Sequence, residues 1–261
     1  MIRELLMGGK DSAKVVFTQR GQNVSRIEGF SDAVFGFALT LLVVSQQVPH
    51  SFDELIVTLR GFFAFAVCFL ALASIWYRHY QFFRRYGMDD GFTIALNTVL
   101  LFVVLFFVYP LKFLADFLVG RLMGVHTALR LADGTVKPML RLTQLHLVFT
   151  CYFAGFATVC LLFALLYAHA YRNRVLLELN AHEACETYIA IVYNVLPVVV
   201  SLGGAVLMSL SQSPYYLHAT IVYIFLIGIG LPVSFKRLQK QRRSVLATPL
   251  TRLSPETESI R

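Results

Sequence analysis

Five polar side chains stand within otherwise apolar stretches of this sequence, and their types suit hydrogen-bond or proton chemistry. Ser31 and Asp32 belong to the run "RIEGFSDAVFGFALTLLVVS", and Trp76, His79 and Asn97 belong to two later runs. Carboxylate and imidazole groups bind and release protons, whereas hydroxyl, indole and amide groups donate or accept hydrogen bonds. Within lipid such groups are costly and are retained for a function or for an internal partner. Their interpretation depends on the elements that hold them.

The composition is typical of a chain that crosses a membrane several times. The 261 residues are 57% hydrophobic and only 15% charged, whereas soluble domains contain about 25% charged residues. A helix needs about 20 apolar residues to cross the hydrocarbon core of a bilayer. The sequence therefore predicts an all-α, polytopic membrane protein with six transmembrane helices, at residues 27–48, 53–83, 91–113, 143–171, 187–210 and 215–235. The long connection after the third span contains the turn residues Gly134 and Pro138, and we expect a short surface helix there.

The distribution of basic residues predicts the orientation of these spans. Most of the 23 Lys and Arg residues fall in segments that share the cytoplasmic side if the N-terminus is cytoplasmic. Because cytoplasmic segments carry an excess of Lys and Arg, we expect both termini in the cytoplasm. The predicted organisation is a cytoplasmic segment 1–25, one six-helix domain 26–235, and a basic cytoplasmic tail 236–261 of disordered composition. The net charge of +8 is interpreted as basic residues that set the membrane orientation and contact lipid headgroups. We therefore expect no nucleic-acid partner.

With this orientation the five polar residues fall in one layer on the cytoplasmic side of the membrane. Each lies within a few turns of the cytoplasmic end of its span, at a rise of about 1.5 Å per residue. Because buried polar groups need partners, we expect one inter-helix network. Its predicted members are Arg26, Ser31, Asp32, Trp76, His79 and Asn97. A proton- or ion-relay role for Asp32 or His79 remains the alternative to a structural network.

Motifs for catalysis or metal binding are weak in this sequence. The stretch "HEACE" at 182–186 is similar to the zinc motif H-E-x-x-H, but Glu186 replaces the second histidine. Glu178 and Glu183, in the same cytoplasmic connection, are expected on a solvated face. The four cysteines form no C-x-x-C pair and are interpreted as small apolar residues. We therefore expect neither an enzyme nor a bound metal or cofactor.

Apolar residues of the first span form a stripe above the polar layer. At about 100° per residue, Leu41 lies about 40° and Val44 about 20° from Phe37 around the helix axis. Thr40 lies about 60° to one side of the stripe, and Asp32 lies about 140° away, towards neighbouring helices. Apolar stripes are usually packing surfaces, so the residues alone favour packing over a pore.

The signature R-x-x-x-F-S-D occurs at the start of the first span, as Arg26, Phe30, Ser31 and Asp32. In these residues the sequence resembles the prokaryotic relatives of the endosomal/lysosomal potassium channel, the transmembrane protein 175 family. The resemblance extends over 26–235 and is strongest in the first three spans, whereas the second half matches only as apolar helices. Further positions that resemble the family are Trp76, His79, Asn97 and Pro110.

This resemblance implies a homotetrameric, potassium-preferring cation channel. Its pore would be lined by the first helix of each chain, without a re-entrant filter loop. The resemblance assigns Arg26, Phe30, Ser31 and Asp32 to the inter-helix network that holds the pore helix. The implied partners are potassium and other monovalent cations, the lipid bilayer and further copies of the chain, and the implied location is the cell inner membrane, multi-pass. A proton-coupled secondary transporter that uses Asp32 remains the alternative function.

The resemblance also assigns roles to the stripe. It implies that Phe37, Leu41 and Val44 form an apolar constriction and that Thr40 is a polar pore contact. An aliphatic residue is usual in the family at the position of Phe37. Four phenylalanines around an axis would either narrow the pore further or offer ring faces to cations.

Overall fold

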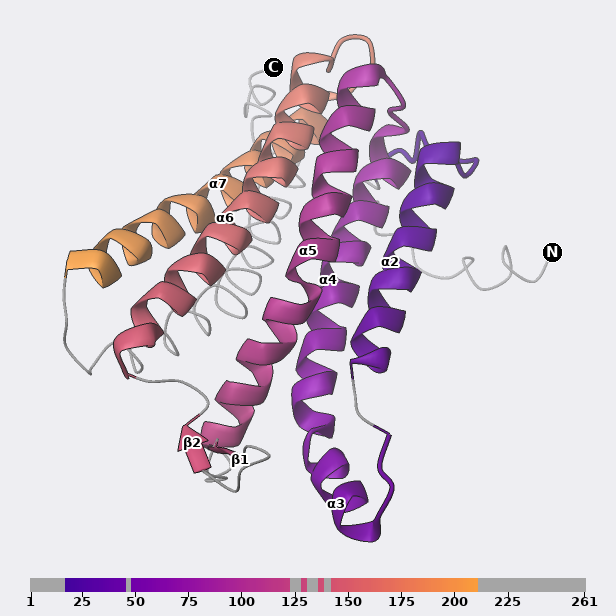
Figure 1. Ribbon diagram of the computed structural model, residues 1–261. Coiled ribbons are helices and arrows are strands. Elements are labelled where there is room, and N and C mark those ends of the chain that lie inside the picture. The colour runs from indigo at the N-terminus through magenta and orange to yellow at the C-terminus, as the bar shows by residue number, and fades with distance from the viewer. Residues whose placement is uncertain (1–16, 46–47, 123–127, 131–135, 139–141, 211–261) are drawn as a thin grey trace, which may run out of the picture. The chain divides into compact units, whose positions relative to one another are not determined.

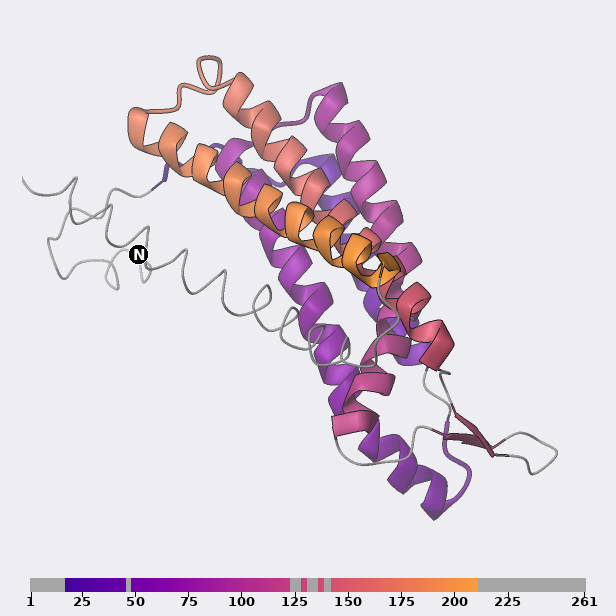
Figure 2. The same cartoon turned by 90° about the vertical axis from the view of Figure 1, so that its left-hand side faces the viewer.

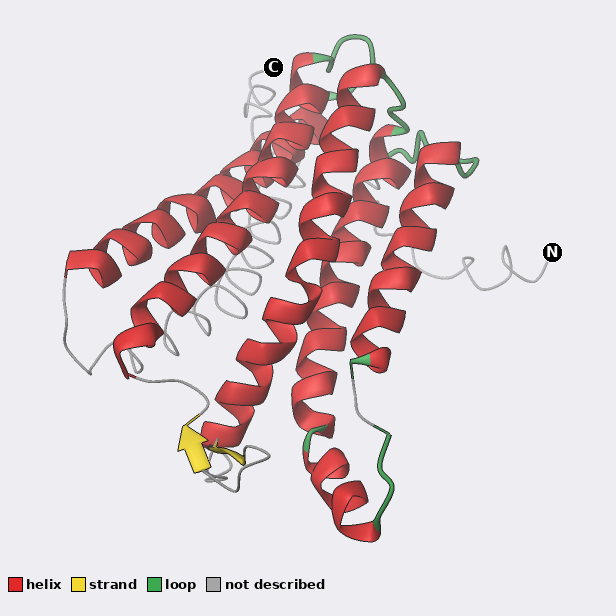
Figure 3. Cartoon of the chain, viewed as in Figure 1, coloured by secondary structure: helices red, strands yellow, loops and turns green. Residues whose placement is uncertain are grey.

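The computed structural model describes residues 17–45, 48–122, 128–130, 136–138 and 142–210, and most of these are helical (Figure 3). The elements, labelled in Figure 1, are α2 (Arg26–Val44), α3 (Phe52–Arg60), α4 (Phe62–Tyr86), α5 (Gly91–Leu122), β1 (Ala128–Arg130), β2 (Val136–Pro138), α6 (Leu142–Arg172) and α7 (Ala181–Leu210). Within the described ranges, α2, α4, α5, α6 and α7 are long and apolar enough to cross a membrane. They overlap the first five predicted spans but differ from them in several boundaries, and α7 begins at Ala181 where residue 187 was predicted. The sixth predicted span, 215–235, and the tail 236–261 lie outside the described residues.

The chain divides into two compact units. The first comprises Met1–Met139 with Leu161–Ile191, and the second comprises Leu140–Cys160 with Val192–Arg261. In the first unit α2, α4 and α5 pack against one another and run side by side in Figure 1, and Figure 2 shows α4 and α5 in a view turned by 90°. In the second unit α6 and α7 approach closely at Gly204, where an added Cβ would lie 3.4 Å from the ring of Phe153.

Helix α2 has a defined start and one buried face. The Oγ of Ser25 accepts a hydrogen bond from the N–H of Glu28, and the Glu28 carboxylate accepts one from the N–H of Ser25, which is a capping box. Buried side chains then recur every three or four residues, so they share one face of the helix. They are Glu28, Ser31, Phe35, Ala38 and Leu42. The opposite face, which includes Phe37 and Val44, is exposed in the single chain.

The second predicted span, 53–83, starts too early, because the structure divides this stretch. Phe52–Arg60 forms the short α3, a turn follows at Gly61, and the apolar helix α4 begins at Phe62. The short helix carries three charged residues, which the hydrocarbon core excludes. Glycine at the junction weakens helix continuity by about 1 kcal/mol relative to alanine. The apolar crossing therefore begins after Gly61.

Helix α5 is longer than predicted and contains Pro110 in its interior. The sequence-based boundary lay near residue 113, because proline removes one backbone donor and usually ends or kinks a helix. The helix continues to Leu122, and one turn beyond the proline the Nζ of Lys112 lies 2.8 Å from the Oδ2 of Asp116. Pairs of opposite charge at this spacing stabilise a helix.

The connection after α5 contains strands in its described part, where a short helix was expected. β1 and β2 pair antiparallel, with Leu129 opposite Lys137 (Figure 3). Pro138 belongs to β2, and a proline lacks the backbone N–H that a helix interior needs, which disfavours the expected helix here.

Candidate functional site

Three helices of the first unit meet at a buried chain of hydrogen bonds. Asn97 on α5 donates from Nδ2 to the Oγ of Ser31 on α2 at 2.9 Å, and its Oδ1 lies 2.8 Å from the Nε2 of His79 on α4. Ser31 in turn donates to the backbone carbonyl of Ile27 at 2.7 Å. The side chains of Ser31, His79 and Asn97 are at most 2% exposed. Polar residues from three separate spans therefore share one site.

The direction of each bond follows from the chemistry of the groups. Because the Oδ1 of Asn97 only accepts, the Nε2 of His79 carries the hydrogen and donates it. The bonds then run one way, from His79 through Asn97 and Ser31 to a carbonyl of the same helix as Ser31. Each bond contributes about 0.5–1.5 kcal/mol net, whereas a buried group that loses its partner costs about 1–3 kcal/mol. The chain thus holds α2, α4 and α5 in one relative position.

Asp32 makes a separate contact on the exposed side of the same helices. The indole Nε1 of Trp76 donates to the Oδ1 of Asp32 at 2.8 Å. The indole also stacks on Tyr80, with ring centroids 5.9 Å apart. Tryptophan and tyrosine concentrate at membrane–water boundaries, where one end of the ring is wet. This contact joins α2 to α4 at the edge of the unit, outside the buried chain.

The remaining two predicted network residues point outward. Arg26 is exposed and has no hydrogen bond or ion pair within the described part of the chain. Phe30 is also largely exposed. The structure therefore brings Ser31, His79 and Asn97 together, places Asp32 with Trp76 beside them, and leaves Arg26 and Phe30 on the opposite side of α2.

The predicted stripe lies on the exposed face of α2. Phe37 is 56% exposed and Val44 is 70% exposed, and Thr40 between them is also exposed. Leu41 is partly buried and lies at the edge of this face. The Oγ1 of Thr40 donates its hydrogen to the carbonyl of Gly36 at 3.0 Å, so its lone pairs face outward. Packing against other described residues therefore accounts for part of Leu41 but leaves Phe37, Thr40 and Val44 exposed.

A contact that the sequence did not predict anchors the residues before α2, which we name the N-terminal strap (residues 17–25). The carboxylate of Glu183 accepts the N–H of Thr18 at 2.7 Å and the Nη2 of Arg20 at 2.8 Å. It also accepts the N–H of Asn180 at 3.2 Å, while Asn180 caps α7. Glu183 is only 1% exposed. The expectation that Glu183 lies on a solvated face was therefore wrong, because the strap covers it.

The strap also lies on the end of α4. The Nη1 of Arg84 donates to the carbonyls of Gly21 at 2.6 Å and Gln22 at 3.0 Å. A Cβ at Gly21 would collide with the carbonyl of Phe83, so only glycine permits this approach. Gly87, which ends α4 with φ of 60°, lies against the same part of the strap. The strap therefore fixes the position at which α2 starts.

The "HEACE" stretch at 182–186 does not form a metal site with other described residues. His182 and Glu186 of the "HEACE" stretch form an i,i+4 pair with 3.8 Å between Nε2 and Oε1. No group of three or more His, Cys, Asp or Glu side chains gathers there in an arrangement that would hold a metal ion.

Comparison with known sequences identifies the relatives of this chain. The sequence profile of the family described as endosomal/lysosomal potassium channel TMEM175 matches residues 26–107, which include α2, α4 and the network residues of α5. A potassium channel of Marivirga tractuosa is 38% identical over 220 residues, covering 83% of this chain and 87% of its own length. A potassium channel of Chamaesiphon minutus is 33% identical over 102 residues, covering 36% of this chain and 50% of its own length.

Solved structures give the same result. The potassium channel MtTMEM175, determined as a variant in complex with a nanobody–MBP fusion protein, is 37% identical. It has a TM-score of 0.70 and covers 86% of this chain and 97% of its own. A Chamaesiphon minutus homologue of the lysosomal potassium-selective channel TMEM175 shares the fold at 22% identity, with a TM-score of 0.54 and coverage of 80% of this chain and 96% of its own. These relatives are named as channels, which agrees with the expectation that the chain is not an enzyme. The similarity over most of both chains shows that this chain belongs to the TMEM175 family of potassium channels.

Proposed function

We propose that this chain is the subunit of a potassium-preferring cation channel, a homotetramer in which α2 of each copy lines the pore. The observation that carries the proposal is the division of α2 into two faces. Its buried face is held against α4 and α5, with Ser31 at the polar layer. Its other face presents Phe37, Thr40 and Val44 outward from the single chain. The names of the relatives favour an ion path over lipid as the occupant of that outward face.

Phe37, Leu41 and Val44 form the proposed gate. A narrow apolar ring expels water and so blocks ions until the ring widens. Four phenylalanine rings at the position of Phe37 make this constriction bulky, and their faces are attractive to cations that reach them. Opening then requires a movement of α2 that separates the rings.

Thr40 supplies the polar contact of the proposed pore. Its hydroxyl hydrogen is already donated to the carbonyl of Gly36, so the oxygen presents lone pairs to a passing cation. A pore without a carbonyl filter selects by the cost of partial dehydration, which is lower for potassium than for sodium. The expected preference for potassium is therefore modest.

The buried chain of hydrogen bonds supports a structural role over proton transfer. The bonds run one way from His79 to the carbonyl of Ile27, and the amide of Asn97 in the middle does not pass protons on. Asp32 lies outside this chain and accepts a hydrogen from Trp76. We infer that these residues position the pore helix, and that the transporter alternative is the weaker one.

The proposed setting is the inner membrane of a prokaryotic cell, with both termini in the cytoplasm. In the described structure, Arg84 and Arg85 end α4, and Arg172 and Arg174 follow at the end of α6. An excess of arginine at these ends favours the cytoplasmic side. Residues 26–235 would form the channel domain and 236–261 its cytoplasmic tail.

The test is flux through proteoliposomes that contain the purified chain. Passive potassium flux down its gradient, with no accompanying proton movement, is the expected result. Uphill potassium movement driven by an imposed proton gradient would overturn the channel in favour of a transporter.

A further inference from the structure

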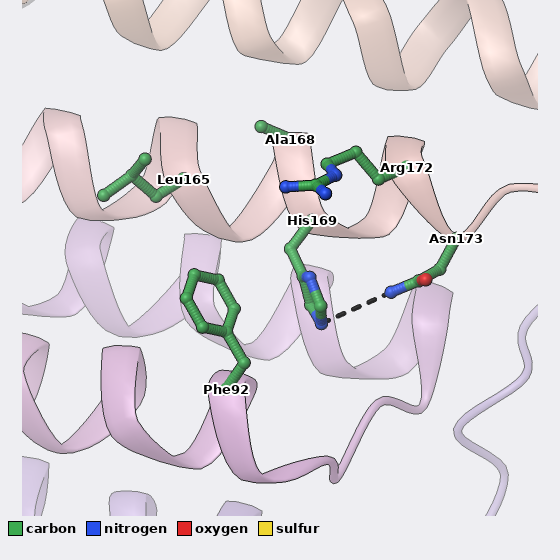
Figure 4. Close-up of a pocket in the computed structure, with 6 residues that line it drawn as sticks. All are labelled: Phe92, Leu165, Ala168, His169, Arg172 and Asn173. Atoms are coloured by element: carbon green, nitrogen blue, oxygen red, sulfur yellow. Dashed lines mark hydrogen bonds between the residues drawn. The ribbon is translucent and has the colours of Figure 1, made fainter.

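A pocket of about 350 Å³ lies beside the last turns of α6, within the first unit. It is lined by Phe92, Leu165, Ala168, His169, Arg172 and Asn173 (Figure 4). Leu165 lies at one end, and Arg172 and Asn173 lie towards the other, where α6 ends. The guanidinium of Arg172 turns back along the helix towards His169. None of these residues belongs to the proposed pore or to the network behind it.

Along the axis of α6, the pocket lining changes from the apolar Leu165 to the cationic Arg172 at the end of the helix. Leu165 precedes Arg172 by seven positions on α6, which is about 10 Å along the helix axis. Since α6 is a membrane span that ends at Arg172, Leu165 lies at the depth of the acyl chains and Arg172 at the depth of the headgroups. Phe92, whose ring centroid is 4.6 Å from that of His169, lies between these levels.

The hydrogen-bond directions leave the amide hydrogens of Asn173 available. The Nε2 of His169 lies 2.9 Å from the Oδ2 of Asp90 and 3.3 Å from the Nδ2 of Asn173, the second contact being dashed in Figure 4. A carboxylate only accepts, so Nε2 carries the hydrogen and donates it to Asp90. That nitrogen then has no lone pair for Asn173, whose amide hydrogens remain for another acceptor.

The charges around the pocket favour an anion at its headgroup end. The Asp90 carboxylate contacts the pocket residue His169, and it also accepts a hydrogen bond from the hydroxyl of Thr93 at 2.6 Å. Arg172 is exposed and has no ion pair or hydrogen bond among the described residues. The guanidinium of Arg172 and the amide of Asn173 line the same pocket and supply N–H donors that suit phosphate oxygens.

We propose that this pocket binds a glycerophospholipid, with its phosphodiester held by Arg172 and Asn173 and one acyl chain lying on Leu165, Ala168 and Phe92. The proposal rests on the depth at which α6 ends and not on the proposed pore. Free phosphate shares the headgroup chemistry but lacks the chain, and the apolar end of the pocket favours the lipid. With the termini in the cytoplasm, the lipid belongs to the inner leaflet.

The test measures lipid binding to the purified full chain by native mass spectrometry in detergent. The probes are dioleoyl phosphatidylglycerol, dioleoylglycerol without phosphate, and glycerol phosphate without acyl chains. Arg172→Ala is expected to weaken phosphatidylglycerol binding at least about tenfold, because a charge-assisted hydrogen bond is lost. Arg174→Ala is the matched control, since its guanidinium lies over the Tyr171 ring at 4.9 Å and does not line the pocket.

A second variant tests the apolar end of the pocket. Leu165→Trp fills space there, and we expect the fold to accommodate it because Leu165 is 40% exposed. It is expected to weaken phosphatidylglycerol binding while Arg172 is intact. Equal effects of Arg172→Ala and Arg174→Ala would overturn the proposal. The proposal would also be overturned if dioleoylglycerol bound as tightly as phosphatidylglycerol. If glycerol phosphate bound as tightly, the pocket would be a free-phosphate site and not a lipid site.

Discussion

The Nε2 of His79 on α4 donates a hydrogen bond of 2.8 Å to the Oδ1 of Asn97 on α5, deep within the first unit. Asn97 then donates to Ser31 on α2, so one amide connects three helices. Within lipid no water can take over the hydrogen bonds of this amide, so the amide must keep its two side-chain partners. We call the Asn97 amide with these partners, His79 and Ser31, the fixed point. We infer that this fixed point holds the proposed pore helix.

Asn97→Ala tests the fixed point. The substitution leaves the Nε2 hydrogen of His79 without an acceptor, at a cost of about 1–3 kcal/mol. We expect a lower melting temperature of the detergent-solubilised protein. Thr98→Ala is the control, because Thr98 is exposed and bonds only to a carbonyl of its own helix. Equal melting temperatures of the two variants would show that the buried chain does not contribute to stability.

Glu183→Gln tests the anchor of the N-terminal strap. The amide keeps the size of the side chain but loses the charge that pairs with Arg20 at 2.8 Å, which is worth about 1.5–3 kcal/mol for a hydrogen bond to a charged group. Trypsin should then cleave after Arg20 at least several-fold faster. Glu178→Gln is the control, since the Glu178 side chain is exposed. Cleavage rates that match between the two variants would contradict the anchoring role.

Leu41→Ser tests the proposed apolar gate. A hydroxyl in the constriction holds water and so lowers the barrier to ion entry. We expect a raised leak current in planar bilayers. Val43→Ser is the control, because Val43 is exposed but lies about 120° from Phe37 around the helix. An unchanged current in Leu41→Ser, or an equal rise in Val43→Ser, would count against the assigned stripe.

Asp90 lies between α4 and α5, and we expect its carboxyl group to make the stability of the fold depend on pH. Partial burial opposes its charge, but hydrogen bonds from Thr93 and His169 outweigh burial and lower the pKa of the Asp90 carboxyl. A carboxyl with a lowered pKa stabilises the folded state above its ordinary pKa, and this contribution is lost as the pH falls through the folded pKa.

The measurement is the melting temperature between about pH 6 and pH 3, where carboxyls protonate. The unmodified protein should lose more stability over this range than Asp90→Asn. Asp89→Asn replaces an exposed neighbouring carboxyl and should behave like the unmodified protein. Parallel curves for the unmodified protein and Asp90→Asn would contradict the predicted role.

The sequence predicted the five apolar helices of the described part and the contact of Ser31, His79 and Asn97, because both follow from local rules. Continuous apolar runs and their length locate α2, α4 and α5, and the depth of Ser31, His79 and Asn97 follows from the rise of the helix. It did not predict the split at Gly61 or the continuation of α5 through Pro110. Helix boundaries depend on tertiary packing that propensity does not contain.

The sequence did not predict the contact between the N-terminal strap and Glu183, for a different reason. Glu183 and Arg20 are far apart in sequence, and no local pattern brings them together. Asn180 followed by Glu183 is a capping pattern that indicates the start of α7, but it does not predict that the carboxylate is buried. The outward direction of Arg26 likewise depends on which face of α2 packs against α4 and α5. The sequence of α2 defines that face only in part.

The most direct test of the proposed function is a planar-bilayer recording of the purified protein with potassium on one side and sodium on the other. The expected result is discrete unitary currents whose reversal potential shows a preference for potassium. Under the same conditions, Leu41→Ser should conduct more than the unmodified protein. If folded protein and Leu41→Ser are both silent, or if the currents reverse with no preference for potassium, the proposal of a potassium-preferring pore lined by α2 is contradicted.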